Sequence, residues 1–264
     1  MVRGGGWVPG PERMLTMSER GVAVVTGASS GIGAATARQL AADGFEVICA
    51  ARRAERVQAL AAEIGGRALA CDITVQADVD ALTAAVGAEL AVLVNNAGGA
   101  IGLEPVSAAD LDAWEQMYAV NVLGTERVTR ALLPALIAAR GAVVFVTSTA
   151  ADAAYEGGAG YCGVKAAERM IAGSLRLEFY DQPIRITEIS PGMVATEEFS
   201  LTRFGGDQAK AEAVYAGVPD PLQAADVAEA IAWMATRPAH VNIDRLVIRP
   251  VSQAANHKVF RRSE

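Results

Sequence analysis

Three side chains near the middle of the chain could together move a proton. Ser148 follows a strand-like run, and Tyr161 and Lys165, four residues apart, open a predicted helix shortly after it. Residues at this spacing share a helix face, so the ammonium and the phenol can meet in one pocket. A free phenol titrates near about 10, and a nearby cation moves its pKa toward the range useful for general acid and base catalysis. The pattern therefore predicts the proton partner of a hydride transfer, with Ser148 bonded to the substrate oxygen. An exposed helix face is the alternative for the Tyr–Lys pair alone.

A glycine-rich segment near the start of the chain has the spacing of a phosphate-binding turn. The run VAVVT, at residues 22–26, leads into GASSGIG and then into an Ala-rich segment with helical character. Glycines at such a turn let the backbone approach a ligand, and the free N–H groups of the new helix bind a pyrophosphate. The residues predicted to contact the cofactor here are Gly27, Ser29, Ser30, Gly31, Ile32 and Gly33. A glycine-rich turn without a ligand is the plainer alternative.

The same segment also fits a competing chemistry. GASSG matches the GxSxG nucleophile elbow of serine hydrolases, with Ser29 as the nucleophile. Such an elbow needs an earlier strand and loop for part of its oxyanion hole, and here the first predicted strand is the one that feeds the turn. It also needs a histidine base, but His240 lies in a predicted loop and His257 in a polar C-terminal segment. The pattern therefore favours cofactor binding over hydrolysis.

The end of the second predicted strand indicates which cofactor is bound. A carboxylate at this position binds the ribose hydroxyls of NAD, whereas a cation binds the 2′-phosphate of NADP. The run EVICA, at residues 46–50, is followed by Ala51, Arg52 and Arg53, and the nearest carboxylate, Glu55, already lies in the next predicted helix. Arginine is poorly placed at the positive end of a helix unless an anion offsets it, and its guanidinium suits a phosphate. The sequence thus predicts NADP as the cofactor.

The elements that would position these residues alternate between strands and helices. Seven short β-rich runs lie at residues 22–26, 46–50, 67–71, 90–94, 142–147, 184–190 and 245–249. Between them lie stretches with helical periodicity, such as 34–44 and 221–236, the latter opened by Pro221 at the first-turn position. This alternation predicts an α/β fold of the doubly wound Rossmann type, a seven-stranded parallel sheet flanked by helices on both faces. Its ligand crevice would lie at the carboxyl ends of the strands.

The chain is expected to form a single domain. A length of 264 residues, 52% of them hydrophobic, suffices for one large core. We expect a Rossmann-fold domain over residues 21–264, preceded by a disordered arm over residues 1–20 that is rich in Gly, Pro and charge. The longest stretch without a predicted strand, about 193–222, is a candidate substrate flap over the crevice.

Composition argues against several kinds of partner. The formal net charge of -7 leaves no basic face for nucleic acid. Cys49, Cys71 and Cys162 lie far apart without metal-ligand spacing, which predicts no disulfide framework, no metal site and a reducing compartment. No apolar run approaches the roughly eighteen residues that a membrane-spanning helix needs. We therefore expect a cytoplasmic protein that binds neither nucleic acid nor membranes.

Taken together, these motifs resemble the short-chain dehydrogenase/reductase family from about residue 21 to the end of the chain. TGASSGIG looks like the cofactor turn of that family, and Ser148, Tyr161 and Lys165 look like its catalytic residues. Asn121, in MYAVNVLG, resembles the helix asparagine that completes the catalytic tetrad by holding a water in the proton relay to the lysine. The resemblance also implies that Lys165 binds the nicotinamide ribose.

The resemblance implies further cofactor contacts along the crevice. Asp72, in CDIT, looks like the adenine contact, and NNAG, at 95–98, looks like the motif that supports the central sheet beside the cofactor. The residues around ISPG would lie over the nicotinamide. The contacts expected in this group are Asp72, Ile73, Asn95, Ala97, Gly98, Pro191, Gly192, Val194 and Thr196. Asp72 and Asn95 also fit plain structural roles, at a helix start and in a turn.

Within that family, several shorter stretches resemble the NADP-dependent 3-hydroxy acid dehydrogenases of the serine or allo-threonine type. They are GLEP at 102–105, TEEFSLTRFGGD at 196–207, RPAHVNID at 237–244 and RPVSQ at 249–253. This resemblance implies a small alcohol or carbonyl substrate. For a 3-hydroxy acid, Arg203 in the flap is the candidate partner of the carboxylate. Arg203 could instead pair on the surface with Glu197 or Glu198.

The resemblance to this family also has an implication for assembly. In the family that the chain resembles, the helices that carry Asn121 and Tyr161 pack against their copies in another subunit, which implies a homotetramer or a homodimer. A different class stays open: an NADP-binding redox sensor on the same fold, which would control a partner without turning over a substrate. The complete tetrad favours an enzyme over such a sensor.

Overall fold

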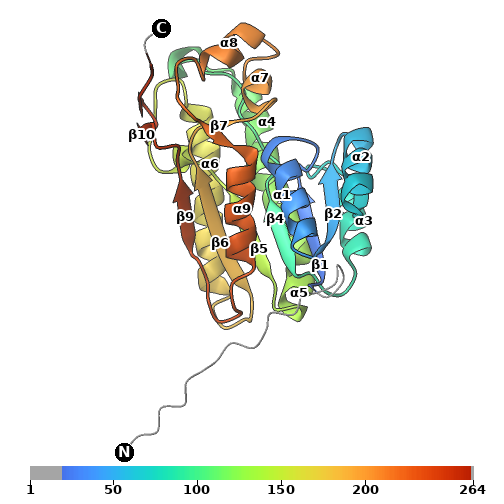
Figure 1. The fold of residues 1–264 in the computed structure, drawn as a ribbon. Helices are drawn as coiled ribbons and strands as arrows, with labels where there is room; N and C mark the ends of the chain where they lie inside the picture. The colour runs from blue at the N-terminus through green and yellow to red at the C-terminus, as the bar shows by residue number, and fades with distance from the viewer. Residues whose placement is uncertain (1–19, 263–264) are drawn as a thin grey trace, which may run out of the picture.

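The computed structural model describes residues 20–262 and contains a parallel sheet of seven strands (Figure 1). The strands are β1 (Val22–Thr26), β2 (Glu46–Ala51), β3 (Arg67–Ala70), β4 (Val92–Asn95), β5 (Ala142–Val146), β6 (Arg185–Pro191) and β9 (Arg245–Ile248). Their order across the sheet is β3-β2-β1-β4-β5-β6-β9. The predicted Rossmann-type sheet is thereby confirmed. The arm predicted at 1–20 lies, apart from its last residue, outside the described part of the chain. Within residues 20–262, no helix is both long and apolar enough to cross a membrane.

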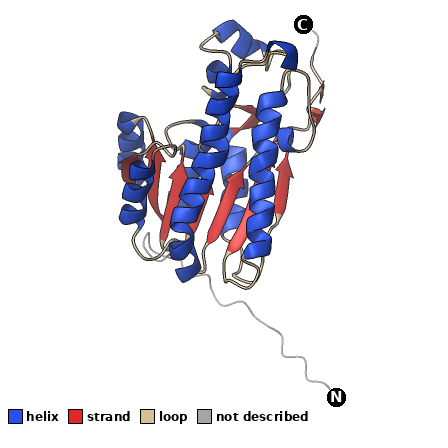
Figure 2. Cartoon of the chain, turned by 180° about the vertical axis from the view of Figure 1, so that it is seen from behind, coloured by secondary structure: helices blue, strands red, loops and turns tan. Residues whose placement is uncertain are grey.

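Helices cover both faces of this sheet (Figure 2). The helices on one face are α1 (Gly31–Ala42), α2 (Ala54–Ile64) and α9 (Ala224–Ala235), and those on the other are α3 (Gln76–Val86), α5 (Thr125–Ala138) and α6 (Ala159–Glu178). Successive strand residues point to opposite faces, so in β1 Val25 packs into the first core and Val24 into the second. Because both faces are buried, the central strands are nearly continuous apolar runs.

The carboxyl edge of the sheet is where the chain reverses its direction of strand addition. β1 pairs with β2 on one side and with β4 on the other. The connections that leave these two strands therefore run to opposite sides, and a crevice opens between them. The loops that follow β1 and β4 are the segments placed to line this crevice.

The helix predicted at 221–236 begins later than expected. α9 starts after Gln223, whose backbone N–H donates to a carboxylate in the first turn. Pro221 precedes the short strand β8 (Leu222–Gln223), so the prediction that Pro221 opens the helix is wrong. It fails because β8 pairs with β7 (Val194–Ala195), a contact between distant segments that a local pattern does not contain.

The predicted flap contains regular structure of its own. It includes α7 (Phe199–Arg203) and α8 (Gln208–Ala213), and the pair of β7 and β8 joins its two ends. The expectation that 193–222 has no strand is therefore wrong. Figure 1 shows α7 and α8 above the carboxyl ends of the sheet strands. The segment is thus a small closed unit at the edge where the crevice lies.

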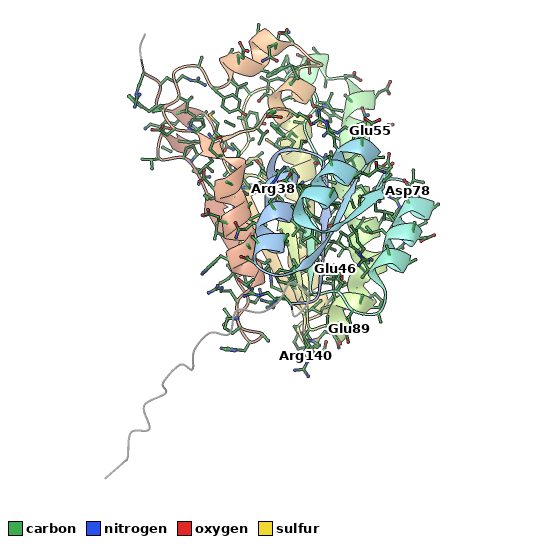
Figure 3. The ribbon with its side chains drawn as sticks, turned by 45° about the vertical axis from the view of Figure 1, so that its right-hand side comes forward. Arg38, Glu46, Glu55, Asp78, Glu89 and Arg140 are labelled. Carbon is green, nitrogen blue, oxygen red and sulfur yellow. The ribbon has the colours of Figure 1, made fainter. Side chains whose placement is uncertain are left out.

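Acidic residues in the first turns of two helices suit the helix dipole. Glu55 lies in the first turn of α2 and Asp78 in that of α3 (Figure 3). The Asp78 carboxylate also accepts a hydrogen bond of 2.8 Å from the backbone N–H of Asp72. This bond fixes the turn after β3 and so places Asp72 at the carboxyl edge of the sheet.

Candidate active site

Close contacts shape the glycine turn after β1. Gly27 and Gly31 have positive φ angles of 67° and 52°. A Cβ atom at Gly27 would lie 2.9 Å from the Cα atom of Ala97, and one at Gly33 would lie 2.4 Å from the carbonyl oxygen of Gly27. These glycines therefore let the turn pack against the loop after β4 and let α1 pack onto the turn. The side chain of Ser30, the N-cap of α1, makes no capping hydrogen bond. The first N–H groups of α1 are thus suited to an anion.

Two cavities meet at this turn. One has a volume of about 430 Å³ and extends past Tyr161 to the flap, and the other has a volume of about 540 Å³ and extends to Arg53. The residues that line both cavities are Gly27, Ser30, Ala97, Gly98, Gly99 and, from the flap, Phe199. Together the cavities form an elongated site with an anion-binding turn at its middle, which is the arrangement that a dinucleotide requires.

Ser148, Tyr161 and Lys165 lie together on the wall of the first cavity. Ser148 follows β5, and its hydroxyl accepts a hydrogen bond of 3.1 Å from the N–H of Ala150 at the start of the 3-10 helix η3 (Thr149–Ala151). Lys165 Nζ lies 5.9 Å from the centroid of the Tyr161 ring. Both side chains are buried, so the exposed helix face that the spacing left open is excluded.

Burial has the largest effect on the acidity of Tyr161. Loss of solvent raises the pKa of the phenol, whereas the Lys165 cation and the Ser148 hydroxyl lower it, and the net shift is upward. The sequence predicted only the lowering by the lysine. The difference arises because burial is a tertiary property, and Tyr161 is only 9% exposed. At neutral pH, Tyr161 is therefore a neutral phenol that can donate a proton.

Asn121 lies in the π-helix η2 (Ala119–Gly124), which joins α4 (Leu111–Tyr118) to α5. Its amide nitrogen donates to the carbonyl oxygens of Met117 and Gly99 over 2.8 and 3.1 Å, and its amide oxygen accepts from the N–H of Gly99 over 3.0 Å. The side chain is buried and lines neither cavity. Asn121 thus fixes the loop after β4, and its role in a proton relay stays a prediction.

The two asparagines of NNAG point in different directions. Asn95 donates a hydrogen bond of 2.7 Å to Thr129 of α5, is buried and lines neither cavity. Asn96, which was not predicted, lines the first cavity and donates over 3.0 Å to the carbonyl oxygen of Thr26. Neighbouring strand residues face opposite sides, so only one of the pair can reach the site. Strand alternation through β4 could have identified Asn96 as that residue.

The second cavity ends in a cluster of cations around one carboxylate. Arg53 donates to the hydroxyls of Ser29 and Ser30, over 2.7 and 2.9 Å, and forms an ion pair of 2.7 Å with Glu198 of the flap. Arg56 pairs with the same carboxylate. The hydrogen bond from Arg53 is the main reason why the pKa of Glu198 falls to about 2. An anion therefore stands at the predicted phosphate position, and the residues present fit the phosphate of NADP.

Sequence reasoning missed two members of this cluster. Arg56 could have been found, because it lies one helical turn after Arg53 in ARRAER and shares its face. Glu198 is 145 residues from Arg53 along the chain, and no local signal connects the two. Arg52, the other predicted cation, lines the second cavity.

The adenine end of the site contains the residues predicted for it. Asp72 and Ile73 line the second cavity. The Asp72 carboxylate accepts hydrogen bonds of 2.9 and 2.7 Å from the N–H and the hydroxyl of Thr74, which holds the turn before α3. The carbonyl oxygen of Ile73 accepts a bond of 2.9 Å from Arg127 of α5. The backbone that faces the cavity is thus fixed by its own turn and by a side chain of α5.

The turn after β6 lines the first cavity. Its predicted cofactor contacts there are Pro191, Gly192, Val194 and Thr196. A Cβ atom at Gly31 would lie 3.4 Å from the Cγ2 atom of Thr196, so Thr196 packs against the glycine turn. The Oε1 atom of Gln253, which was not predicted as a site residue, accepts a bond of 2.7 Å from the N–H of Met193 and lies where a Cβ at Gly192 would be. Gln253 therefore supports this part of the cavity wall.

Arg203 faces the first cavity. Its Nε atom donates to the carbonyl oxygen of Gly102 over 3.0 Å, and its guanidinium carbon lies 5.6 and 5.8 Å from the ring centroids of Tyr155 and Tyr161. Its Nη2 atom is buried and has no hydrogen-bond partner within the described residues. The predicted alternative of a surface pair with Glu198 is wrong, because Glu198 pairs with Arg53 at the second cavity.

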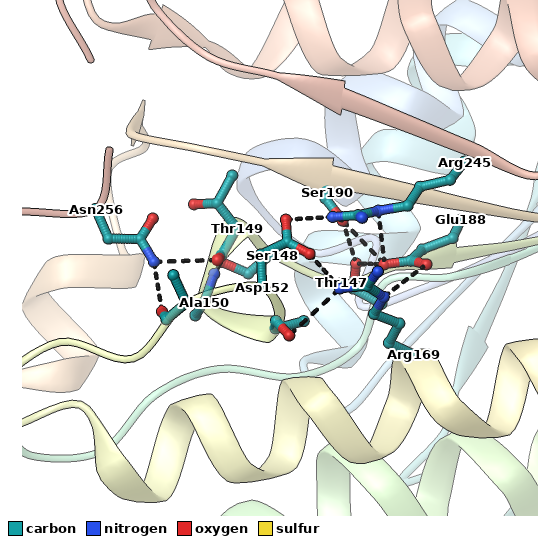
Figure 4. A network of polar contacts seen from close by, with 12 residues as sticks. Thr147, Ser148, Thr149, Ala150, Asp152, Arg169, Glu188, Ser190, Arg245 and Asn256 are labelled. Carbon is teal, nitrogen blue, oxygen red and sulfur yellow. Dashed lines mark hydrogen bonds and ion pairs between the residues drawn. The ribbon is translucent and has the colours of Figure 1, made fainter. Parts of the chain in front are cut away.

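A polar network behind Ser148 holds its loop in place (Figure 4). Asp152 forms ion pairs with Arg169 of α6 and Arg245 of β9. Glu188, buried in β6, lies 3.7 Å from Arg245 and accepts a hydrogen bond of 2.7 Å from the hydroxyl of the residue that precedes Ser148. The loop is therefore tied to three different elements, and the Ser148 hydroxyl is held at a defined position.

The doubly wound sheet and the site at its carboxyl edge define a dinucleotide-binding oxidoreductase. The model of the short chain dehydrogenase family matches residues 21–203. The chain belongs to this family, as its motifs predicted, and it is an enzyme of the oxidoreductase class. The serine hydrolase alternative for GASSG is thereby excluded.

Relatives and solved structures extend the match over most of the chain. The chain is 58% identical over 235 residues to an uncharacterized oxidoreductase of Mycobacterium tuberculosis, covering 89% of this chain and 92% of the relative. It is 42% identical to the serine 3-dehydrogenase of Agrobacterium fabrum, covering 92% and 99%. A solved closed form of a serine dehydrogenase complexed with NADP+ superposes with a TM-score of 0.86 at 37% identity, covering 92% of this chain and 100% of the other.

Proposed function

We propose that the protein transfers a hydride between NADP(H) and a small alcohol or carbonyl substrate, with Tyr161 as the general acid and base. The observation that carries this proposal is the meeting of Ser148, Tyr161 and Lys165 on the wall of a cavity that continues into the glycine turn. The NADP+ complex of the similar serine dehydrogenase supports the same cofactor. So do the cations that surround Glu198.

The residues along the two cavities would hold the cofactor over its whole length. The glycine turn would bind the pyrophosphate, Arg53 the 2′-phosphate and Lys165 the nicotinamide ribose. Asp72 lies at the adenine end and Thr196 near the glycine turn. When bound, NADP supplies the hydride donor or acceptor.

The chain's own residues handle the proton in this proposal. During reduction, the neutral Tyr161 hydroxyl donates its proton to the carbonyl oxygen, and during oxidation the phenolate takes a proton from the alcohol. The Ser148 hydroxyl binds the same substrate oxygen. The Lys165 ammonium stabilises the phenolate, whose charge would otherwise be costly in so buried a position.

A spectrophotometric screen tests this function. The purified protein is mixed with NADPH and a panel of small aldehydes, ketones and 3-oxo acids, and the loss of NADPH absorbance is followed. We expect turnover of at least one carbonyl compound and, with NADP+, oxidation of the corresponding alcohol. Tight NADPH binding without turnover of any compound would favour the redox sensor instead.

Cofactor preference should depend on Arg53. We expect Arg53→Ala to weaken NADPH binding by about ten- to a hundredfold, because one charge-assisted contact with the 2′-phosphate is lost. Binding of NADH, which lacks that phosphate, should stay within about twofold. Fluorescence titration of both cofactors measures the change, and Ala51→Asp with Arg52→Ala should shift the preference in the same direction. Arg67→Ala, which removes an arginine paired with Glu46 outside both cavities, is the control. Equal affinities of the unaltered protein for NADPH and NADH would contradict the assignment.

The position of Arg203 favours a substrate that carries a carboxylate. Its guanidinium lies over the Tyr161 ring, and its Nη2 atom is buried at the cavity without a partner among the described residues. A buried, unsatisfied donor of a cation is costly unless an anion binds it, and a carboxylate fits the planar guanidinium. Serine is itself a 3-hydroxy acid, and the similar serine 3-dehydrogenase supports this substrate class. We therefore propose a 3-hydroxy acid as the substrate, with Arg203 as the partner of its carboxylate.

Arg203→Ala should discriminate between charged and neutral substrates. We expect KM for 3-hydroxy acids to rise by roughly ten- to a hundredfold while KM for a neutral alcohol of similar size changes little, since only binding to the carboxylate is lost. Steady-state kinetics with matched pairs of acid and neutral substrates measures the difference. An equal effect on both members of a pair would make Arg203 a structural residue of the flap.

Exposed apolar side chains support an assembly of subunits. They lie on α4, η2 and α6, the helices predicted to contact another subunit, and are Leu111, Tyr118, Leu123, Met170 and Leu177. Such side chains on neighbouring helices are typical of an interface. We propose that this surface joins copies of the chain into a homodimer or homotetramer, and light scattering should give a mass of at least two subunits. A monomer at working concentration would contradict this.

We also propose that the protein lies in the cytoplasm. The three cysteines, Cys49, Cys71 and Cys162, are all free. This supports the prediction of a reducing, cytoplasmic location.

A further inference from the structure

A buried carboxylate stands directly behind the lysine of the active site. The Oε2 atom of Glu168 lies 2.6 Å from Lys165 Nζ, and their side chains are only 3% and 5% exposed. Tyr161, Lys165 and Glu168 are spaced by four and three residues on α6, so they form one stripe along the same helix face. The helix thus carries an acid, a cation and an anion in sequence from the cavity inward.

The surroundings of Glu168 leave Lys165 as its main partner. On α6 it faces Tyr161 and Lys165, on α5 the hydroxyl of Thr125 gives it a hydrogen bond, and on β6 the carboxylate of Glu188 repels it. The charged neighbours further along, on α6 and β9, are already paired with other carboxylates. They are Arg169 and Arg245, which hold Asp152 and Glu188.

Burial and pairing act on Glu168 in opposite directions. Burial raises the pKa of its carboxyl to about 7, although the Lys165 cation and the Thr125 bond lower it. Burial also lowers the pKa of Lys165, but the Glu168 and Tyr161 charges outweigh burial and raise it overall. Burial therefore disfavours the charge of Glu168, and the Lys165 cation is the main group that opposes burial.

We propose that Glu168 is a positioning residue that holds the Lys165 ammonium from behind and weakens its pull on the Tyr161 phenol. This inference rests on the proposed role of Tyr161 as general acid and base. It extends the set of groups that control the proton from the Tyr161–Lys165 pair to three residues on one helix face.

The electrostatic reason is the balance of charge around the phenol. With Lys165 alone, a phenolate at Tyr161 faces one full positive charge, which favours it. The Glu168 carboxylate cancels part of that charge and adds its own repulsion, so it raises the pKa of Tyr161. A carboxylate that served only to bury the lysine would leave the titration of Tyr161 unchanged.

The experiment uses the glutamine variant of Glu168 and a matched control on the same helix. Glu168→Gln removes the charge but keeps an oxygen that can accept from Lys165, whereas Glu178→Gln removes an equal charge from the exposed end of α6. Tyrosine ionisation is followed by absorbance in the whole protein without cofactor, with Tyr161→Phe used to identify the signal of Tyr161. We expect the midpoint of Tyr161 to fall by about one pH unit in Glu168→Gln and to stay unchanged in Glu178→Gln.

Kinetics provides the second measurement. The rise of kcat/KM with pH for alcohol oxidation should move to lower pH in Glu168→Gln by the same amount as the Tyr161 midpoint. Glu168→Asp, which keeps the charge but withdraws it by one methylene, should give a smaller shift, and it serves as the test variant if Glu168→Gln does not fold. An unchanged midpoint would overturn the proposal. So would a shift to higher pH, which would mean that Glu168 chiefly keeps Lys165 charged.

The titration of Tyr161 tests the role of Glu168, and turnover of a carbonyl compound tests the proposed function, so the two claims can fail independently. The titration needs no turnover, so an unshifted Tyr161 midpoint overturns the role of Glu168 even in an active enzyme. A shifted midpoint in a protein that reduces no carbonyl compound supports the role of Glu168 and contradicts only the proposed function.

Discussion

Replacing Tyr161 with Phe should lower kcat by about a hundred- to ten-thousandfold, the usual contribution of a positioned general acid or base. Only the hydroxyl is lost, because the Phe ring can keep the packing against Phe199, whose ring centroid lies 5.7 Å away. NADPH affinity should therefore stay within about twofold of its original value. Steady-state kinetics and fluorescence titration measure the two quantities.

Tyr155→Phe is the matched control for this variant. Tyr155 also lines the first cavity and also lies under the Arg203 guanidinium, but it does not share a helix face with Lys165. We expect Tyr155→Phe to keep most of the activity. If Tyr155→Phe lost activity and Tyr161→Phe kept it, the acid and base would be Tyr155 and the assignment of Tyr161 would be wrong.

Lys165→Met should impair cofactor binding, turnover and folding together. The variant loses the cation that stabilises the phenolate and that is proposed to bind the ribose. It also leaves Glu168 buried without its ion partner, and breaking a buried pair on one side costs about 3–5 kcal/mol. This large loss distinguishes Lys165→Met from Tyr161→Phe, which should fold normally.

The stability of Lys165→Met should depend on pH in a defined direction. Without Lys165, nothing of comparable strength opposes the burial that raises the pKa of Glu168 above its ordinary value of 4.5. A carboxyl with a raised pKa in the folded state favours folding only while it is protonated, so stability should fall as pH rises from about 4.5 through the folded-state pKa. Chemical denaturation at several pH values measures this slope. Adding Glu168→Gln to Lys165→Met should remove the slope and recover most of the lost stability, and a slope that persists in the double variant would show that Glu168 is not its source.

Most of the sheet could be predicted because its central strands are buried on both faces. A strand such as β4 contributes Leu93 to one core and Val94 to the other, so it is apolar up to Asn95 at its end and the run stands out in the sequence. The helix start at Pro221 could not be predicted, because the pairing of β7 with β8 decides where that helix begins. A local pattern predicts an element well when the burial of that element alone produces the pattern, as it does for an apolar strand.

Part of the site could be predicted because its residues lie close together in the sequence. The spacing of Tyr161 and Lys165 on one helix already places them together, and the glycine turn is a local motif. The net rise in the pKa of Tyr161 depends on burial by other segments, and the Arg53–Glu198 pair joins residues far apart in the chain. Glu168 lies three residues after Lys165, within reach of the same spacing rule, but only its burial distinguishes it from a surface ion pair.

The π-helical segment η2 makes the register of one helix depend on a single residue. It lies between α4 and α5 without a break, so the three form one rod in which one stretch is wound more loosely than the rest. Each residue of an α-helix turns the chain by about 100°, because a turn contains about 3.6 residues. A π-helical turn holds about one residue more than an α-helical turn, so deleting one residue within 119–124 would let the rod close as a regular α-helix with its two halves nearly in place, while the residues of that turn rotate around the axis. Asn121 could then no longer hold both the N–H and the carbonyl oxygen of Gly99, so the length of this rod, counted in residues, sets the shape of the loop on which the two cavities meet.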